Sequence, residues 1–245
     1  MSARVTLATA ARVLAQLRRD PRTIGLLLVV PCVLLGLLSL VFDGRPQVFD
    51  RIGGPLLGVF PFISMFLVTS VATLRERTSG TLERLLTLPM GRLDLLLGYA
   101  LAFGAVAVVQ ALLSSAFALG VLDLDVRGPV WALLLVAVLD ALLGTALGLL
   151  VSAFAATEFQ AVQFLPAVVL PQVLLCGLLT PRADMQQALQ WVANALPLTY
   201  AVEAMEQVTA STEVTGTYLR DALVITGIVV GALVLGAATL RRRTA

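Results

Sequence analysis

The chain has 245 residues, of which 59% are hydrophobic and only 13% are charged, and its formal net charge is +2. This composition excludes an ordinary soluble domain and is typical of a polytopic membrane protein. All 17 basic residues are arginine, and because a P-loop needs a lysine to hold nucleotide phosphates, we expect no ATPase activity in this chain. No nucleophile–base pair or metal-ligand cluster appears in the sequence, so we expect no other enzyme activity and no bound cofactor. We expect no nucleic-acid partner either.

The first predicted element is an amphipathic helix over residues 3–22. Leu7, Ala10 and Leu14 recur at helical spacing on one side, and Arg4 and Arg12 lie on the other. A helix of this kind lies in the headgroup region of a bilayer, with its basic face toward anionic lipid. We therefore expect an interfacial helix in contact with membrane lipid before the first span.

Six apolar runs are long enough to cross the hydrocarbon core, which takes about 20 residues of helix. These runs cover residues 24–42, 52–74, 95–119, 130–154, 159–179 and 222–240. The predicted fold class is therefore all-α, a single transmembrane domain over residues 1–245 with six helical spans.

The arginines set the predicted orientation of the spans. With the N-terminus in the cytosol, twelve arginines lie on the cytosolic side and five on the outer side, in agreement with the positive-inside rule. Both termini are thus expected in the cytosol. An arginine-only basic complement is typical of a GC-rich bacterial genome, so the expected location is the bacterial plasma membrane.

Residues 75–94, RERTSGTLERLLTLPMGRLD, form a charged segment between the second and third spans. The segment is too polar to cross the membrane, and its leucines cluster on one helical face, opposite Glu76, Gly80, Glu83 and Arg84. Two acids, arginines and a glycine that permits close approach suit a pocket on a cytosolic partner. A surface helix whose arginines bind phosphates is the alternative.

The connection of residues 180–221 is predicted to form helices on the outer side. Residues 185–196 are amphipathic, and Pro181 and Pro197 act as start and stop signals around them. The stretch after Pro197 is mildly apolar, but Glu203 and Glu206 prevent it from crossing the membrane by itself. We expect a folded cap that is partly re-entrant.

Polar residues inside the spans are further candidate sites. Asp140 lies near the middle of the fourth span, where an unpaired charge is costly. It is either a proton or cation site, or an acid facing the bundle, protonated or hydrogen-bonded to a neighbour such as Gln110 or Thr145. In the fifth span, Gln163 and Gln172 give the helix polar character that suits either a substrate path or contacts between helices.

Two sets of motifs resemble those of a known family. The order E-x3-G-T-x-E-x-L at residues 76–85, just after the second span, is similar to that of the permeases of ATP-binding-cassette (ABC) type-2 exporters, the class of daunorubicin-resistance permeases. G-x3-P at residues 177–181 and N-x2-P-L-T-Y-A-V-E at residues 194–203 resemble the same family's outer loop. The resemblance extends over nearly the whole chain.

This resemblance implies a half-transporter that forms a dimer with a second permease, either a copy or a homologue, on two cytosolic ABC ATPase subunits that bind ATP and Mg. It implies a coupling helix in contact with the ATPase, with the matching and adjacent positions Glu76, Arg77, Gly80, Thr81, Glu83 and Arg84. It also implies a substrate path that runs between the two permeases and is lined largely by the second and fifth spans, with candidates Phe62, Phe66, Thr69, Gln163 and Gln172. The implied activity is export of a hydrophobic or amphiphilic drug, antibiotic or lipid-like molecule.

Two other functions stay open at this stage. A secondary transporter, independent of ATP, would use Asp140 as its coupling site, although no inverted repeat is visible in the sequence. A membrane anchor that does not transport would use residues 75–94 to hold a cytosolic partner. Such an anchor would need no polar path, so the glutamines of the fifth span weigh against it.

Overall fold

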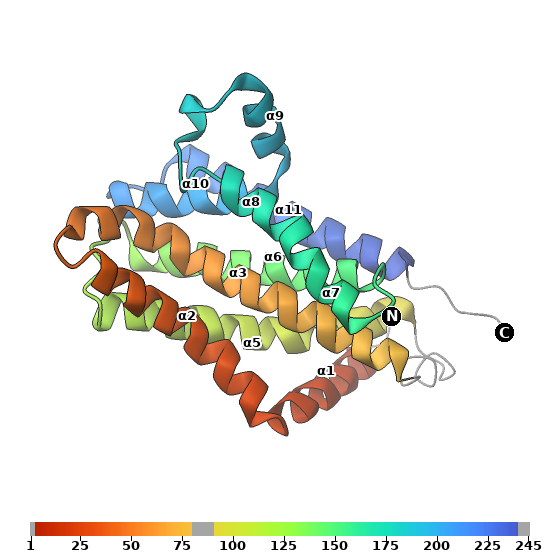
Figure 1. The fold of residues 1–245 in the computed structure, drawn as a ribbon. Coiled ribbons are helices and arrows are strands. Elements are labelled where there is room, and N and C mark those ends of the chain that lie inside the picture. Colours follow the sequence, from red (N-terminus) through yellow and green to blue (C-terminus); the bar gives the residue numbers. More distant parts are fainter. Residues whose placement is uncertain (1–2, 80–90, 240–245) are drawn as a thin grey trace.

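The computed structural model describes residues 3–79 and 91–239, and the regular structure in these ranges is entirely helical (Figure 1). Six helical segments are long and apolar enough to cross a membrane, which confirms the predicted fold class and number of spans for the described ranges. The helices are α1 (Ala3–Arg18), α2 (Pro21–Val41), α3 (Pro46–Thr78), α5 (Arg92–Gly120), α6 (Val130–Ser152), α7 (Glu158–Phe164), α8 (Leu170–Leu175), α9 (Gln187–Ala195), α10 (Pro197–Ala210) and α11 (Gly216–Thr239).

A sharp elbow separates α1 from α2, so that α1 crosses the end of the bundle (Figure 1). Asp20 caps α2, because its carboxylate accepts hydrogen bonds from the backbone N–H of Thr23 at 3.2 Å and from the Thr23 hydroxyl at 2.6 Å. Pro21 occupies the first turn, where its missing N–H costs nothing. The chain therefore starts a new helix here in a new direction.

The centre of the bundle is the contact between α3 and α6, the most extensive helix pair in the described chain. Gly144 and Gly148 of α6 permit it, because a methyl group at Gly144 would overlap the Phe62 carbonyl and one at Gly148 would lie 2.6 Å from the Phe66 carbonyl. Small residues at such crossings bring helix backbones close together, which is how spans associate without a hydrophobic driving force between them.

The fifth span is irregular and shorter than predicted. A π-helical turn at Leu165–Val169 separates α7 from α8, and the helix ends at Leu175, whereas the sequence analysis placed its end at residue 179. Gly177 explains the early stop, since its φ of +105° is a conformation that L side chains rarely adopt. The π-helical turn contains Pro166, whose missing N–H removes one regular helical hydrogen bond.

Helix α10 lies inside the bundle, packed against α3, α6 and α11. Thr209 lies against Gly54, and the Met205 methyl would lie 3.3 Å from a methyl group at Gly58. The N–H of Leu198, at the start of α10, points to the side chain of Gln172 in α8 at 3.4 Å. Part of the predicted cap is thus an internal helix, because one face of α10 is apolar and buried.

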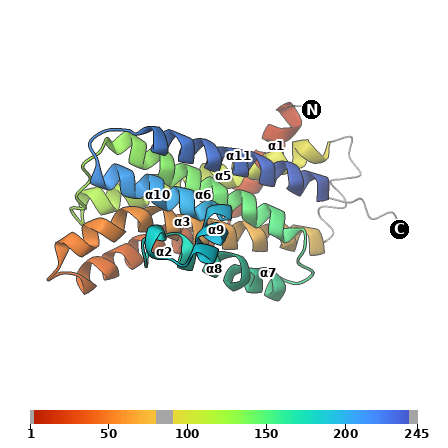
Figure 2. The same ribbon diagram turned by 90° about the horizontal axis from the view of Figure 1, so that it is seen from above.

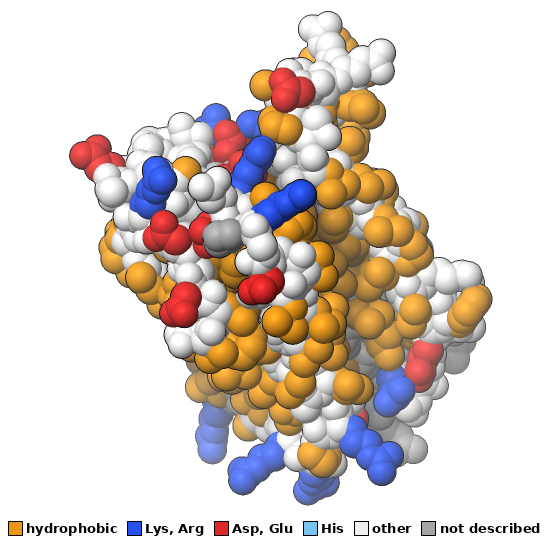
Figure 3. Space-filling model, turned by 60° about the vertical axis from the view of Figure 1, so that its left-hand side comes forward, with side chains coloured by type: hydrophobic (Ala, Val, Ile, Leu, Met, Phe, Trp, Pro, Cys, Tyr) orange, Lys and Arg blue, Asp and Glu red, His pale blue; other side chains and the backbone are white. Residues whose placement is uncertain are grey.

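The outer surface of the bundle is broadly hydrophobic. α2, α7–α8 and α11 are the least buried spans, and Leu26, Leu40 and Leu223 are among their exposed side chains. On the face in Figure 3, a wide belt of hydrophobic side chains separates mixed charges in the upper part from arginines along the lower edge. Viewed from above, the long helices run side by side (Figure 2). An exposed hydrophobic belt of this size is a surface that lipid or another subunit would cover.

Candidate functional site

Charged side chains tie several helices together at the end of α3. Arg75, Glu76 and Arg77 are consecutive in its last turns, and each has a partner on a different helix. Successive side chains of an α-helix are rotated by about 100°, so the three residues reach three different neighbours. The sequence predicts a separate surface segment from residue 75 onward, whereas these three residues continue α3 beyond the predicted boundary at residue 74.

Glu76 binds Arg12 of α1 and Tyr99 of α5. Arg12 Nη1 and Nη2 donate to the two carboxylate oxygens at 3.1 and 3.0 Å. Arg12 Nη2 also donates to the Tyr99 hydroxyl at 2.9 Å, and that hydroxyl donates in turn to Glu76. The guanidinium carbon lies 5.8 Å from the centre of the Tyr99 ring. A two-pronged pair of this kind fixes orientation as well as adding energy, so α1, α3 and α5 are locked at this point.

A close helix contact positions Arg12 for this role. α1 packs on α5 at Gly98, where a methyl group would lie 2.5 Å from Cβ of Thr9 and 3.0 Å from the Thr6 carbonyl. Val13 of α1 is buried as well. The predicted apolar face is divided, since Ala10 packs on protein while Leu7 and Leu14 stay exposed.

The two arginines beside Glu76 reach α7 and α6. Arg75 Nε and Nη2 donate to the carboxylate oxygens of Glu158 at 3.0 and 3.1 Å. Arg77 Nη1 donates to the Ser152 carbonyl at the end of α6, one of the carbonyls that a helix end leaves without a helical partner. Both side chains of the Arg75–Glu158 pair are exposed, so that pair orients α7 more than it stabilises the fold.

The other predicted coupling residues, Gly80, Thr81, Glu83 and Arg84, lie outside the described residues. Glu76 and Arg77 are therefore the only two of the six predicted positions that the described chain places. Both lie in the last turn of α3, shortly before residues 80–90.

A cavity of about 430 Å³ lies beside α9 and α10. A second, of about 410 Å³, opens beside the Arg12–Glu76 contact. The wall of the second is mostly apolar and includes Leu67, Val68, Val71 and Ala72 of α3, Phe103 of α5 and Val162 of α7. Its polar rim consists of Gln16, Asp20, Thr23, Arg75 and Glu76. We name this space the α3–α7 cavity. An apolar wall with polar groups at one edge suits an amphiphilic ligand.

The predicted path residues on α3 do not face this cavity. Phe62, Phe66 and Thr69 are fully buried in the contact with α6, and the Thr69 hydroxyl donates to the Met65 carbonyl at 2.6 Å. The cavity lies instead against the adjacent face of α3, which the sequence-based prediction does not include. Leu67, Val68, Val71 and Ala72 repeat at the helical spacing of one stripe, which is the signal that could have found them.

The two glutamines of the fifth span do not share a face. Gln163 is exposed, whereas Gln172 is buried and donates to the Val168 carbonyl at 3.0 Å. Its carbonyl oxygen faces the Leu198 N–H at 3.4 Å. Gln172 therefore joins α8 to the start of α10, and Gln163 remains the one accessible glutamine of the predicted pair.

Asp140 is fully buried between α6, α3 and α10. Neither carboxylate oxygen has a hydrogen-bond partner in the described part of the chain. A methyl group at Gly58 would lie 2.7 Å from Oδ2. The two expected neighbours bond elsewhere, since Gln110 donates to the Leu27 carbonyl at 2.9 Å and Thr145 to the Ala141 carbonyl at 3.0 Å. A buried carboxyl in this setting is disfavoured in its charged form.

A family comparison matches residues 4–209 to the ABC-2 type transporter family. Among curated relatives, "ABC transporter G family member 20" of Dictyostelium discoideum is 26% identical over 67% of this chain and 23% of its own length. "Probable multidrug ABC transporter permease YbhR" of Escherichia coli K12 is 28% identical over 68% of this chain and 43% of its own length. "Inner membrane transport permease YhhJ" of the same strain is 27% identical over 63% of this chain and 42% of its own length. The chain thus spans less than half the length of these relatives.

Proposed function

The chain belongs to the ABC-2 type transporter family, and from this premise we propose that it is a non-catalytic permease subunit of an ABC exporter. Two cytosolic ATPase subunits, with ATP and Mg bound to them, supply the energy. Two permeases, either two copies or a pair of homologues, form the membrane part. The transported molecule is hydrophobic or amphiphilic, which is consistent with the word multidrug in the name of one relative.

The observation that carries this proposal is the arrangement at the end of α3. Residues 80–90 follow that end directly, and Arg75, Glu76 and Arg77 connect it to α7, to α1 with α5, and to α6. A push on residues 80–90 by an ATPase would therefore move four neighbouring helices together. Packed side chains and salt-bridge networks of this kind carry energetic coupling between sites.

The proposed orientation places this end of the bundle in the cytosol, with both termini on the same side. Arg4, Arg12, Arg18 and Arg19 of the N-terminal region and Arg75 and Arg77 of α3 then all lie on the cytosolic side, as the positive-inside rule favours. The exposed Leu7 and Leu14 of α1 would enter the headgroup boundary of the inner leaflet.

The α3–α7 cavity supports an amphiphilic substrate. On the proposed orientation it opens at the level of the inner leaflet, with its polar rim toward the cytosol and its apolar wall toward the membrane core. A molecule that partitions into the inner leaflet would place its apolar part against Val71 and Val162. The second and fifth spans then form the first part of the path.

The experiment that tests the proposal is affinity capture of the detergent-solubilised chain from its native membrane, followed by an ATPase assay on the eluate. We expect a P-loop ATPase to co-elute, and Glu83→Arg to abolish its capture or to uncouple its ATP hydrolysis from transport. Glu213→Arg is the matched control, because Glu213 is exposed and lies between α10 and α11, at the opposite end of the bundle. An eluate without ATPase would contradict the proposal.

One observation favours a second candidate function. Asp140 is buried with both carboxylate oxygens unpartnered in the described residues, which suits a group that takes up and releases a proton. A proton-driven transporter would need transport without ATPase and with a dependence on Asp140, and the same capture experiment distinguishes it from the ABC permease.

A further inference from the structure

The first of the two cavities, of about 430 Å³, lies at the far end of the fifth span, where α8, α9 and α10 meet. We name it the α10 cavity. Its polar lining includes Arg182, Asn194, Thr199, Glu203 and Glu206. Thr199, Glu203 and Glu206 are spaced by four and three residues, so they share one face of α10.

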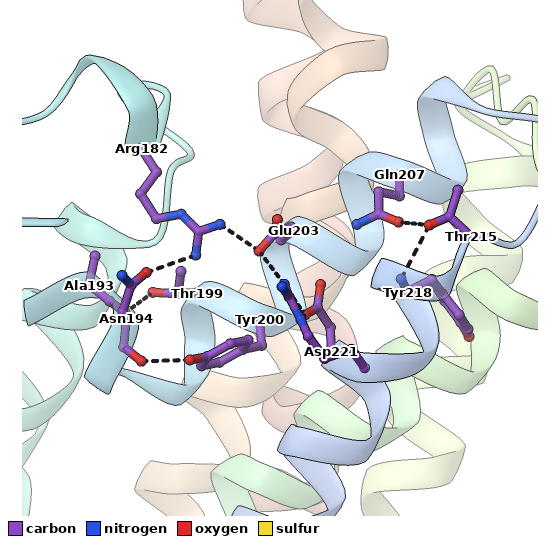
Figure 4. A network of polar contacts seen from close by, with 11 residues as sticks. Arg182, Ala193, Asn194, Thr199, Tyr200, Glu203, Gln207, Thr215, Tyr218 and Asp221 are labelled. Carbon is purple, nitrogen blue, oxygen red and sulfur yellow. Dashed lines mark hydrogen bonds and ion pairs between the residues drawn. The ribbon is translucent and has the colours of Figure 1, made fainter. Parts of the chain in front are cut away.

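Most of the polar groups in this cavity are already paired with one another. Arg182 donates to Glu203 at 2.7 Å and to Asn194 at 3.2 Å, and Glu203 also accepts from Arg220 of α11 at 3.4 Å. Figure 4 shows Arg182 placed between Asn194 and Glu203, with Tyr200 beneath them. The pairing fixes the cavity wall and neutralises the charge of Glu203.

Helix α9 is fastened to α10 by two further hydrogen bonds. The Thr199 hydroxyl donates to the Ala193 carbonyl at 2.7 Å, and the Tyr200 hydroxyl donates to the Asn194 carbonyl at 2.7 Å (Figure 4). Both carbonyls lie near the end of α9, where a helix leaves carbonyl groups without helical partners. The cavity is therefore a formed feature of the fold.

Glu206 also lines the cavity, but it takes no part in this network of ion pairs and hydrogen bonds. Within the described part of the chain its side chain makes no hydrogen bond or ion pair, although it lines the cavity. Burial raises its pKa above the usual glutamate value, the charge of Glu203 acts in the same direction, and Arg51 and Arg182 act in the opposite one. Arg182 and Arg220 form ion pairs with Glu203 and Asp221, so Glu206 is the carboxylate of the lining without an ion-pair partner among the described residues.

We propose that the α10 cavity binds the cationic amine group of the transported molecule, with Glu206 as its counter-ion. The proposal rests on the proposed function, since it makes the substrate an amine-bearing amphiphile that meets this cavity at the outer end of α8. A volume of about 430 Å³ is within the usual range of ligand pockets and leaves room for an ammonium group with its substituents. A metal ion fits less well, because the described residues contain no cluster of three or more His, Cys, Asp or Glu residues.

The interaction is expected to be a charge-assisted hydrogen bond in a partly buried setting. Bonds of this kind contribute enough to change affinity by roughly ten- to a hundredfold. Glu206→Gln should therefore weaken binding of an amine at least tenfold and leave a neutral analogue unaffected. Protonation of Glu206 should do the same, so binding should weaken as the pH falls through its raised pKa.

The test uses the purified full chain in nanodiscs and two fluorescent probes, dansylcadaverine and its N-acetyl derivative, which share a fluorophore and differ in the charged amine. We expect the wild type to bind the amine at least tenfold more tightly than the acetylated probe. Glu206→Gln should lose this preference and Glu206→Asp should keep it. Glu213→Gln, which changes an exposed glutamate outside the cavity lining, is the control that should also keep it.

Equal binding of the two probes by the wild type, no binding of either, or a preference that survives Glu206→Gln would overturn the proposal. The measurement involves no ATPase, so its outcome is separate from that of the capture experiment. Capture of an ATPase by a chain without amine preference would leave the proposed function in place and remove only the substrate class. Amine preference without capture of an ATPase would contradict the proposed function and leave the amine-binding site in place.

Discussion

Arg12 and Glu76 are 64 residues apart in the sequence and form a two-pronged ion pair, at 3.1 and 3.0 Å, that joins the N-terminal helix to the end of α3. The side chains are 29% and 15% exposed, so the pair is only partly screened by water. Tyr99 closes the arrangement from α5. On the proposed function, this contact makes α1 a part of the coupling machinery.

The first prediction is rescue by exchanging these two charges. Arg12→Glu and Glu76→Arg should each lower the free energy of unfolding by about 1–3 kcal/mol, because each leaves a partly buried charge facing its like. The double variant should recover most of the loss and also restore the coupling of ATP hydrolysis to transport. The measurements are thermal unfolding in detergent and the ratio of transport to hydrolysis in vesicles. A double variant no better than the singles would show that the pair does not act as a unit.

The second prediction concerns the α3–α6 contact. Gly144→Ala should lower the free energy of unfolding by about 1–3 kcal/mol, because the added methyl group would overlap the Phe62 carbonyl. Gly227→Ala is the matched control, since nothing in the described chain lies within 4 Å of its added methyl group. Unchanged melting of Gly144→Ala in detergent would mean that α3 and α6 do not pack as described.

The third prediction tests the α3–α7 cavity. Val71→Trp should fill much of a space of about 410 Å³ and slow transport, while capture of the ATPase stays normal. Leu101→Trp is the control, because Leu101 is 50% exposed on α5 and outside the cavity lining. Transport at the wild-type rate by Val71→Trp would exclude the cavity from the path.

The fourth prediction separates the two roles open to Asp140. If the carboxyl is structural, Asp140→Asn should retain ATP-driven transport, since the amide has nearly the same shape and fits beside Gly58. Asp140→Leu should be no less stable than the wild type, because it replaces a buried carboxyl that has no hydrogen-bond partner among the described residues by an apolar group of similar shape. Transport by Asp140→Asn should be compared across pH values. Loss of a pH-dependent component in this variant alone would instead support the proton-driven transporter.

The fifth prediction concerns the elbow between α1 and α2. Hydrogen bonds from Thr23 lower the pKa of Asp20 below its usual value of 3.8. A lowered pKa means that the ionised carboxylate stabilises the folded state above the unfolded-state pKa and that this gain disappears as the pH falls through the folded-state pKa. Asp20→Ala should therefore melt at a lower temperature than the wild type at pH 7, with the difference shrinking toward pH 3. A difference in melting temperature that stays constant with pH would mean that ionisation of Asp20 does not cause it.

The sequence predicts the spans well because crossing a membrane imposes one simple requirement, a long apolar helix. The Arg12–Glu76 pair follows no local pattern, since it depends on how α1 crosses the bundle. Phe62 and Phe66 are apolar like Val68 and Val71, so hydropathy could not show which of them face α6 and which face the cavity. Only the glycines at 144 and 148 mark the buried stripe, through the close approach that they allow.

The fifth span shows a different limit. The polarity of Gln163 and Gln172 predicts a polar face on this span. The π-helical turn at Leu165–Val169 lies between them and changes the angle between their side chains around the helix axis. The burial of Gln172 depends further on α10, whose internal position the sequence indicates only weakly. Glu203 and Glu206 argue against α10 as a membrane span, and the apolar face of α10 argues against a surface helix.

The internal position of α10 has a consequence for biogenesis. Its buried face fills a groove lined by Gly54 and Gly58, but α10 precedes only the last span and is too polar to enter the bilayer alone. We expect α10 to enter the bundle as a hairpin with α11, after the earlier spans have left the translocon. Membrane insertion of the first five spans and completion of the core are then separate events.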